Sequence, residues 1–148
     1  MIRVVPDTNV LASGFVRTNP QSPPVQLVDA WRAQLFILLV SEHILAELAR
    51  TFEEPYFSTR LTSTQRTADI SLISDEATIT PITAQVHGVA THFEDDLVLA
   101  TAVSAKANYL VTGDTKLQQL GTYEGVTILS PRAFLDMLQT ETLEGGDD

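Results

Sequence analysis

The sequence predicts an α/β fold with a mostly parallel central sheet, because short apolar segments of strand length alternate with segments of helical periodicity. Parallel strands need long crossover connections, which helices usually supply, and strands buried on both faces form continuous apolar runs. The 148 residues are enough for one hydrophobic core and too few for two ordinary domains. We therefore expect a single domain over residues 1–139, followed by a disordered acidic tail over residues 140–148.

The amino-terminal half of the chain alternates strand and helix patterns. Residues 2–6 are apolar and β-branched, and a polar turn separates them from a helical stretch over residues 10–16. Residues 24–31 form a helical stripe that begins with a proline. The unbroken apolar run over residues 35–40 predicts a buried strand, and the serine after it predicts the N-cap of a helix over residues 41–52.

The carboxy-terminal half continues the alternation. We expect one or two helices over 56–75, a short strand over 78–82, an alanine-rich helix over 95–107, a strand over 109–112 that closes in a turn, a strand over 126–129 and a last helix through Leu138.

Composition excludes several classes of protein. The chain has no cysteine, which excludes disulfides and thiolate metal sites. Its longest apolar run, residues 35–40, is too short to cross a bilayer, and the first residues form a strand pattern and no signal sequence. We therefore expect a cytoplasmic protein with no membrane partner.

The charge balance is unusual for a protein that binds nucleic acid. Nine Lys and Arg face nineteen Asp and Glu, for a net charge of −10. Backbone binding to nucleic acid normally requires the opposite balance. Acids that cluster to hold divalent cations would reverse part of this field locally.

Acidic residues stand where an α/β sheet binds its ligands, beyond the carboxyl ends of the strands. Asp7 follows the first predicted strand and Asp114 follows the strand over 109–112, while Asp95 begins the helix that leads to that strand. Glu47 borders the apolar stripe of its helix and can face the sheet. We expect these acids to converge at one edge of the sheet.

Converging carboxylates repel one another unless protons or cations neutralise them. Oxygen-only ligands favour Mg²⁺ or Mn²⁺ over zinc, and such ions activate water and stabilise charge on a phosphoryl oxygen. Phosphodiester hydrolysis is therefore the predicted chemistry. Each acid also has an ordinary interpretation, because Asp7 and Asp95 can cap helices, Asp114 can belong to a turn and Glu47 can be solvated. Only their joint placement favours a site.

Four segments resemble the motifs of PIN domains, in the order and with the spacing of that family. They are residues 5–11 (VPDTNVL), 41–48 (SEHILAEL), 94–102 (EDDLVLATA) and 108–114 (NYLVTGD), within a resemblance that extends over residues 2–138. The resemblance implies a three-layer α/β/α domain and a metal-dependent ribonuclease.

The resemblance also implies roles for individual residues. The implied catalytic acids and ligands of Mg²⁺ or Mn²⁺ are Asp7, Glu47, Asp95 and Asp114, with Asp96 as a helper of Asp95 or its substitute. The polar residues that would line the site and steady the carboxylates are Thr8, Asn9 and Thr112. Where the family often has a Pro and another Asp, His92-Phe93-Glu94 stands here, so a contribution from Glu94 stays open.

Many bacterial PIN domains are toxins of VapC-like toxin-antitoxin pairs. The resemblance therefore implies an RNA substrate, an antitoxin partner and a homodimer. Because they lie close to motif residues in the sequence, Arg17 and Lys116 are our candidates for binding the phosphates of the substrate.

Two other functions are weighed against this one. A phosphatase of the haloacid-dehalogenase type needs a second Asp two residues after the first, and Asn9 occupies that position. A non-catalytic PIN-fold interaction protein would not need all four acids. The three histidines lack the spacing of a zinc site.

Overall fold

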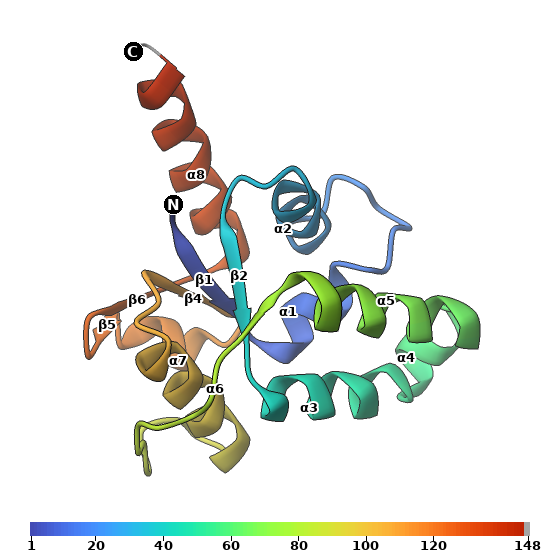
Figure 1. The fold of residues 1–148 in the computed structure, drawn as a ribbon, viewed down its shortest axis with the longest axis horizontal. Coiled ribbons are helices and arrows are strands. Elements are labelled where there is room, and N and C mark those ends of the chain that lie inside the picture. The colour runs from blue at the N-terminus through green and yellow to red at the C-terminus, as the bar shows by residue number, and fades with distance from the viewer. Residues whose placement is uncertain (147–148) are drawn as a thin grey trace.

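A six-stranded sheet of order β3-β2-β1-β4-β6-β5 forms the centre of the protein in the computed structural model, which describes residues 1–146 (Figure 1). The strands are β1 (Arg3–Pro6), β2 (Ile37–Val40), β3 (Thr78–Ile79), β4 (Tyr109–Val111), β5 (Thr122–Tyr123) and β6 (Val126–Leu129). All neighbouring strands run parallel except β5 and β6. The predicted α/β class with a mostly parallel sheet is confirmed.

Helices connect the parallel strands and flank the sheet. They are α1 (Thr8–Ser13), α2 (Pro23–Arg32), α3 (Glu42–Phe52), α4 (Pro55–Ser58), α5 (Ser63–Glu76), α6 (Phe93–Ser104), α7 (Thr115–Gln119) and α8 (Pro131–Gly146). Within residues 1–146, no helix combines the length and apolar character needed to cross a membrane.

The core lies where the central strands meet the helices. Val4 and Val5 of β1 and Leu110 of β4 are fully buried, as expected for strands covered on both faces. Phe36, the residue before β2, packs edge to face on Phe134 of α8, with ring centroids 5.2 Å apart. Each such large side chain contributes about 1.5–3 kcal/mol by leaving water.

Two elements between β4 and β6 escaped the sequence patterns. Helix α7 and strand β5 are too short to show periodicity. The β5–β6 hairpin has a two-residue turn in which Glu124 (φ 48°) and Gly125 (φ 83°) both adopt positive φ. Such turns usually carry Asn-Gly or Asp-Gly, so Glu-Gly gave a weak signal.

The last helix is longer than its sequence pattern indicated. We expected it to end near Leu138, and it continues to Gly146 through part of the segment assigned to the tail. Within this extension, the Thr140 hydroxyl donates a hydrogen bond to the Asp136 carbonyl (3.0 Å), which satisfies a helix carbonyl. Asp147 and Asp148 of the expected tail lie outside the described residues.

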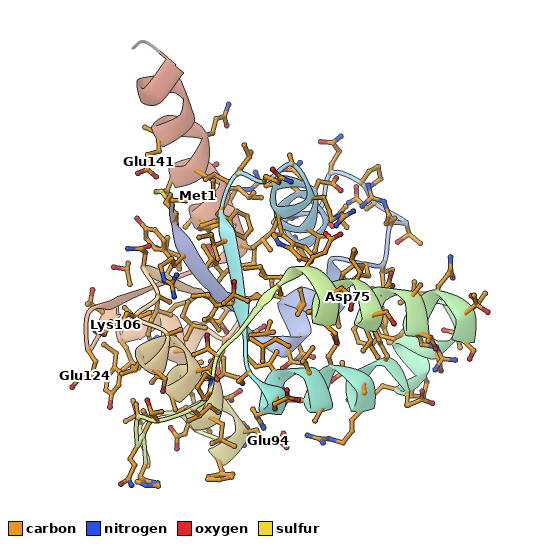
Figure 2. All side chains as sticks on the ribbon, viewed as in Figure 1. Met1, Asp75, Glu94, Lys106, Glu124 and Glu141 are labelled. Atoms are coloured by element: carbon orange, nitrogen blue, oxygen red, sulfur yellow. The ribbon has the colours of Figure 1, made fainter. Side chains whose placement is uncertain are left out.

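The strand order brings the ends of β1 and β4 side by side. Pro6 pairs with Val111 in the parallel register, and the Asp7 amide donates to the Val111 carbonyl (2.8 Å). Residues that directly follow these two strands therefore share the carboxyl edge of the sheet. In Figure 2, Glu94 lies at this end of the molecule and Met1 at the opposite end.

Candidate active site

Asp7 is fixed at the junction of β1 and α1. It is the N-cap of α1, where its Oδ1 accepts a hydrogen bond from the Val10 amide (2.8 Å). Its other oxygen, Oδ2, accepts a short hydrogen bond from the Thr112 hydroxyl. Both oxygens are thus held by the protein, and the helix-capping interpretation of Asp7 is also fulfilled.

Thr112 connects Asp7 to Asp114. Its side chain is fully buried, and its hydroxyl oxygen accepts a hydrogen bond from the Asp114 amide (3.0 Å) while donating to Asp7. Asp114 is in turn the N-cap of α7 and accepts from the amides of Lys116 (2.8 Å) and Leu117 (3.4 Å). One buried hydroxyl therefore sets the relative positions of two of the acids that the sequence singled out.

Asp95 and Asp96 are neighbours in the first turn of α6 and have different surroundings. Asp95 lines a pocket together with Asp7 and Asp114. The side chain of Asp96 is buried, and its carboxylate accepts hydrogen bonds from three backbone amides at residues 88–90, at 3.0, 3.2 and 2.7 Å. Asp96 therefore holds the preceding loop, and it does not line the pocket that contains Asp95.

We call the first of two pockets at this edge the aspartate pocket. It has a volume of about 550 Å³, and its polar lining consists of Asp7, Asn9, Ser13, His92, Asp95 and Asp114. Among the described residues, the pocket is lined by no Lys or Arg. Three carboxylates thus share a pocket whose one basic lining side chain, among the described residues, is the imidazole of His92, which opposes the rise in the pKa of Asp95.

Burial and mutual repulsion raise the pKa values of two of these acids. Burial raises the pKa of Asp7; the hydrogen bonds from Thr112 and Val10 oppose this shift, and nearby Asp95 adds to it. Burial also raises the pKa of Asp95, and the Asp114 carboxylate raises it further. A cation that binds beside such a carboxylate stabilises its ionised form.

The second pocket, which we call the glutamate groove, lies between α3 and the start of α6. It has a volume of about 290 Å³ and is lined by Asn9, Glu47, Arg50, Thr51, Glu54, His92, Glu94 and Asp95. Asn9, His92 and Asp95 line both pockets. The two pockets are therefore adjoining parts of one site.

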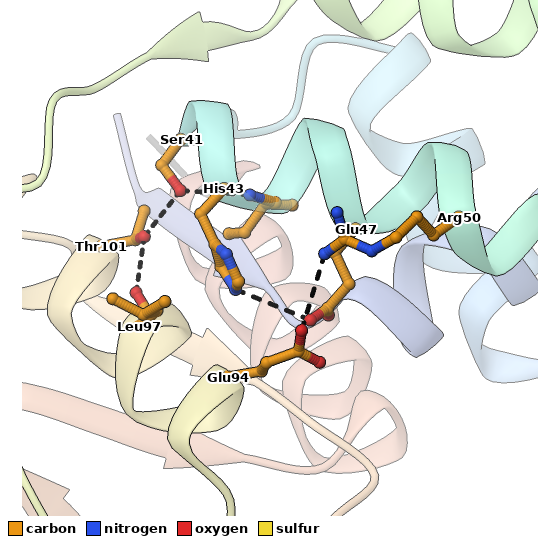
Figure 3. Close-up of polar contacts among 8 residues, drawn as sticks. Ser41, His43, Glu47, Arg50, Glu94, Leu97 and Thr101 are labelled. Carbon is orange, nitrogen blue, oxygen red and sulfur yellow. Dashed lines mark hydrogen bonds and ion pairs between the residues drawn. The ribbon is translucent and has the colours of Figure 1, made fainter.

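A buried hydrogen bond joins the two helices beside this groove. The Thr101 hydroxyl of α6 donates to Ser41 Oγ (2.8 Å), and Ser41 Oγ accepts the Ile44 amide as the N-cap of α3 (3.3 Å). The Thr101 hydroxyl is also close enough to the Leu97 carbonyl to donate to it (2.9 Å), as Figure 3 shows. This contact sets where α3 begins relative to α6.

In the glutamate groove each glutamate shown in Figure 3 has a basic partner. His43 Nε2 lies 3.6 Å from Glu47 Oε2 one turn along α3, and Arg50 Nη2 lies 3.6 Å from Glu94 Oε1. Burial raises the pKa of Glu47, and neighbouring Glu94 contributes to the increase. Glu47 Oε2 is buried and accepts no hydrogen bond from any described residue.

These residues fit a divalent cation by their chemistry. The acids offer oxygen ligands, burial and repulsion raise the pKa values of Asp7 and Asp95, and a buried oxygen of Glu47 accepts no hydrogen bond. Among the described side chains, however, no group of three or more His, Asp or Glu is arranged to hold a metal ion. The match to Mg²⁺ or Mn²⁺ therefore rests on donor type and electrostatics.

The remaining predicted site residues have varied positions. Thr8 is buried, and its hydroxyl lies near Glu47, where it opposes the rise in the pKa of that carboxyl, whereas Asn9 is exposed and lines both pockets. Arg17 forms an exposed ion pair with Asp29 (2.9 Å) and lines neither pocket. Lys116 is exposed on α7 and bonds to Asp114 only through its backbone amide.

The sequence patterns did not identify Arg50 as a site residue, nor His92 as a residue that lines the groove. Arg50 lies three residues after Glu47 on α3, and that spacing places both on the same face of a helix. This spacing was a usable signal. His92 gave no comparable signal, because its place depends on how the preceding loop folds onto Asp96.

Comparisons with known proteins agree with this architecture. A sequence model of the PIN domain matches residues 3–116, a range that contains Asp7, Glu47, Asp95 and Asp114. A search of curated proteins finds no match. A crystal structure of VapBC2 from Rickettsia felis, bound to a DNA fragment from their promoter, aligns with a TM-score of 0.59 and 15% sequence identity, covering 86% of this chain and 97% of that chain. At this identity the likeness shows a shared fold.

Proposed function

Because the chain belongs to the PIN-domain family, we propose that it is a metal-dependent endoribonuclease that hydrolyses RNA phosphodiester bonds at the aspartate pocket. The observation that carries this proposal is the lining of that pocket. Asp7, Asp95 and Asp114 come from three separate parts of the chain and share one pocket at the carboxyl edge of the sheet, without a Lys or Arg among the described lining residues. Such a set of acids repels itself unless protons or cations from solution neutralise it, and it therefore favours cation binding.

The proposed ligands of Mg²⁺ or Mn²⁺ are Asp7, Asp95 and Asp114, with Glu47 contributing from α3. When bound, such ions supply an activated water and stabilise the charge that develops on phosphoryl oxygens. The protein contributes position: Thr112 holds Asp7 and the Asp114 amide, and α1 holds the second oxygen of Asp7. Asp96 supports this set indirectly, because it holds the loop that leads to His92.

The physiological proposal is narrower. We infer a toxin of a toxin-antitoxin pair, with RNA as substrate, an antitoxin as protein partner and a homodimer as the assembled form. Family membership supports this assignment, and the VapBC2 structure supports it through the fold alone. The cytoplasmic location expected from the sequence stays a prediction.

The test is RNA cleavage by the purified wild type and by Asp7→Asn, in Mg²⁺, in Mn²⁺ and in EDTA. We expect cleavage by the wild type with either metal, none in EDTA, and a loss of more than about 100-fold in Asp7→Asn, because substitution of residues that merely support a ligand already costs 10- to 100-fold. Asp75→Asn, an exposed acid on α5, is the matched control and should leave cleavage unchanged.

Mn²⁺ binding and hydrolysis of an aryl phosphate, measured on the same purified proteins, separate the alternatives. A wild type that binds Mn²⁺ but cuts no RNA would support a non-catalytic PIN-fold interaction protein. Hydrolysis of an aryl phosphate without RNA cleavage would support a metal-dependent phosphatase. Either outcome would contradict the ribonuclease assignment.

A further inference from the structure

The few basic residues of this acidic chain are unevenly placed. Several are engaged away from the carboxyl edge, in the ion pairs Arg17–Asp29, Arg32–Glu76 and Arg66–Glu53 and in the stacking of Arg60 on Tyr56. Within the described part of the chain, Arg50 is the one Lys or Arg that lines either the aspartate pocket or the glutamate groove. This guanidinium is therefore the one Lys or Arg group that the described lining of either pocket offers to a polyanion.

The guanidinium of Arg50 is loosely held. Its side chain is 60% exposed, and its partner Glu94 is 59% exposed. The 3.6 Å separation between Arg50 Nη2 and Glu94 Oε1 is too long for a hydrogen bond, and exposed ion pairs of this kind are weak. Arg50 can therefore exchange Glu94 for another anion at little cost.

We propose that Arg50 binds a backbone phosphate of the RNA that neighbours the phosphate at the aspartates, and that Glu94 competes with the RNA for this guanidinium. The inference rests on the proposed function. A guanidinium offers paired donors that match the oxygens of a phosphate, whereas Glu94 contacts it through one oxygen. The groove and the pocket share Asp95, Asn9 and His92, so a strand that crosses the pocket continues past Arg50.

Competition by Glu94 follows from its position. Glu94 is adjacent in sequence to Asp95 and contributes to the raised pKa of Glu47, so it already lies close to other acidic side chains. A phosphate that takes its place at Arg50 leaves Glu94 without its basic partner. Glu94 therefore weakens RNA binding through Arg50, in addition to the diffuse repulsion that every acid of the protein exerts.

The experiment is a double-mutant cycle on RNA affinity. Binding of a fluorescein-labelled single-stranded RNA is measured by anisotropy over a range of salt concentrations, with Ca²⁺ in place of Mg²⁺ and a gel to check that the RNA stays intact. We expect Arg50→Gln to weaken binding about five- to tenfold and to lower the slope of log Kd against log salt by about 0.7, the value for one single-strand phosphate contact. Glu94→Gln should tighten binding clearly more in the wild-type background than in the Arg50→Gln background, where only diffuse repulsion is relieved.

A matched ion pair provides the control. Arg32 and Glu76 are also exposed (44% and 51%), and they line a pocket at the amino edge of β2. Arg32→Gln and Glu76→Gln change the net charge by the same amounts and should leave the salt slope unchanged. Arg17→Gln and Lys116→Gln, measured alongside, test the two candidates suggested by the sequence. Arg50→Lys, which keeps the charge and loses the paired donors, should fall between wild type and Arg50→Gln.

The results separate this inference from the ribonuclease assignment. If Glu94→Gln tightens binding equally with and without Arg50, or if the salt slope of Arg50→Gln equals that of the wild type, the inference is overturned while RNA cleavage by the wild type stands. If RNA binds through Arg50 and is not cut, the ribonuclease assignment fails and the inference holds. A wild type that binds no RNA overturns both.

Discussion

The aspartate pocket and the glutamate groove adjoin, share Asp95, and neutralise their acids by different means. In the groove, Glu47 and Glu94 each have a basic side chain of the protein at 3.6 Å. In the pocket, Asp7 and Asp114 receive hydrogen bonds from amides and from a hydroxyl, and no described lining residue is Lys or Arg. These uncharged donors hold the carboxylates in place without neutralising their negative charge.

This difference predicts that a cation from solution binds more favourably in the pocket than in the groove. A cation in the groove competes with His43 and Arg50, whereas a cation in the pocket meets three carboxylates with His92 as the one basic side chain among the described lining residues. The same difference indicates where RNA is held, since the groove contains the guanidinium. The pocket thus contains most of the proposed metal ligands, with Glu47 added from the groove, and the groove contains the guanidinium that is proposed to bind RNA.

The first prediction compares Asp7 of the aspartate pocket with Glu47 of the glutamate groove. Asp7→Asn should lower Mn²⁺ affinity by more than about 100-fold, because it removes a negative charge from a pocket that no described Lys or Arg lines. Glu47→Gln should lower it by about tenfold or less, because His43 already faces that carboxylate. The measurement is Mn²⁺ titration of each purified variant by calorimetry. Equal losses in the two variants would show that pocket and groove are not distinct metal environments.

The second prediction separates two adjacent acids. Asp96→Asn should destabilise the protein by about 2–3 kcal/mol, because an amide has only one oxygen to accept the three amide donors that the buried carboxylate now accepts. Asp95→Asn, one residue earlier, should leave stability unchanged or raise it, because repulsion with Asp114 is relieved. Urea unfolding in EDTA measures both. A similar loss in both variants would mean that Asp95 is also a structural acid.

This pair of acids shows where sequence reasoning ends. The strand patterns and the rule for carboxyl edges were sufficient to bring Asp7, Asp95 and Asp114 to one pocket, because long-range order in a parallel sheet follows from short apolar runs. The difference between Asp95 and Asp96 depends on the loop over residues 88–90, which has no periodicity. One step along a helix turns a side chain by about 100°, so a loop contact decides which acid faces the pocket.

Glu47 and Arg50 show the same limit at another point. Their helix was predicted from its N-cap Ser41 and its apolar stripe, and both are confirmed. The groove beside them exists because α6 packs against α3 through the buried Thr101–Ser41 hydrogen bond. No local pattern encodes that contact, since the two residues are 60 positions apart.

A third prediction concerns the hydroxyl that holds the pocket together. Thr112→Val keeps the shape of the side chain and removes the donor to Asp7 and the acceptor for the Asp114 amide. We expect Mn²⁺ affinity to fall by about tenfold, the lower range for groups that orient a ligand. Thr112→Ser keeps the hydroxyl and should restore most of the affinity. If serine fails to restore what valine loses, packing by the Thr112 methyl group, and not hydrogen bonding, orients Asp7.

Asp69 lies outside both regions and gives a reference for the effect of burial alone. Burial raises the pKa of Asp69 on α5 to about 6, and neither a neighbouring charge nor a hydrogen bond contributes to the shift. Between its usual pKa near 3.9 and pH 6 the folded protein binds the proton more tightly than the unfolded chain does, so this group's stabilising contribution is lost as pH rises through that window.

Asp69→Asn should therefore stabilise the protein at pH 7, by about 1 kcal/mol, a figure well below full conversion of the shift because the side chain is partly solvated. Below pH 4 the variant and the wild type should have the same stability. Urea unfolding from pH 4 to 7, with and without Mn²⁺, measures the effect. The gain should be independent of metal, because Asp69 lines neither pocket, whereas the stability contributed by Asp7 and Asp95 should depend on metal. A gain from Asp69→Asn that vanished in Mn²⁺ would contradict the confinement of metal binding to the site formed by the pocket and the groove.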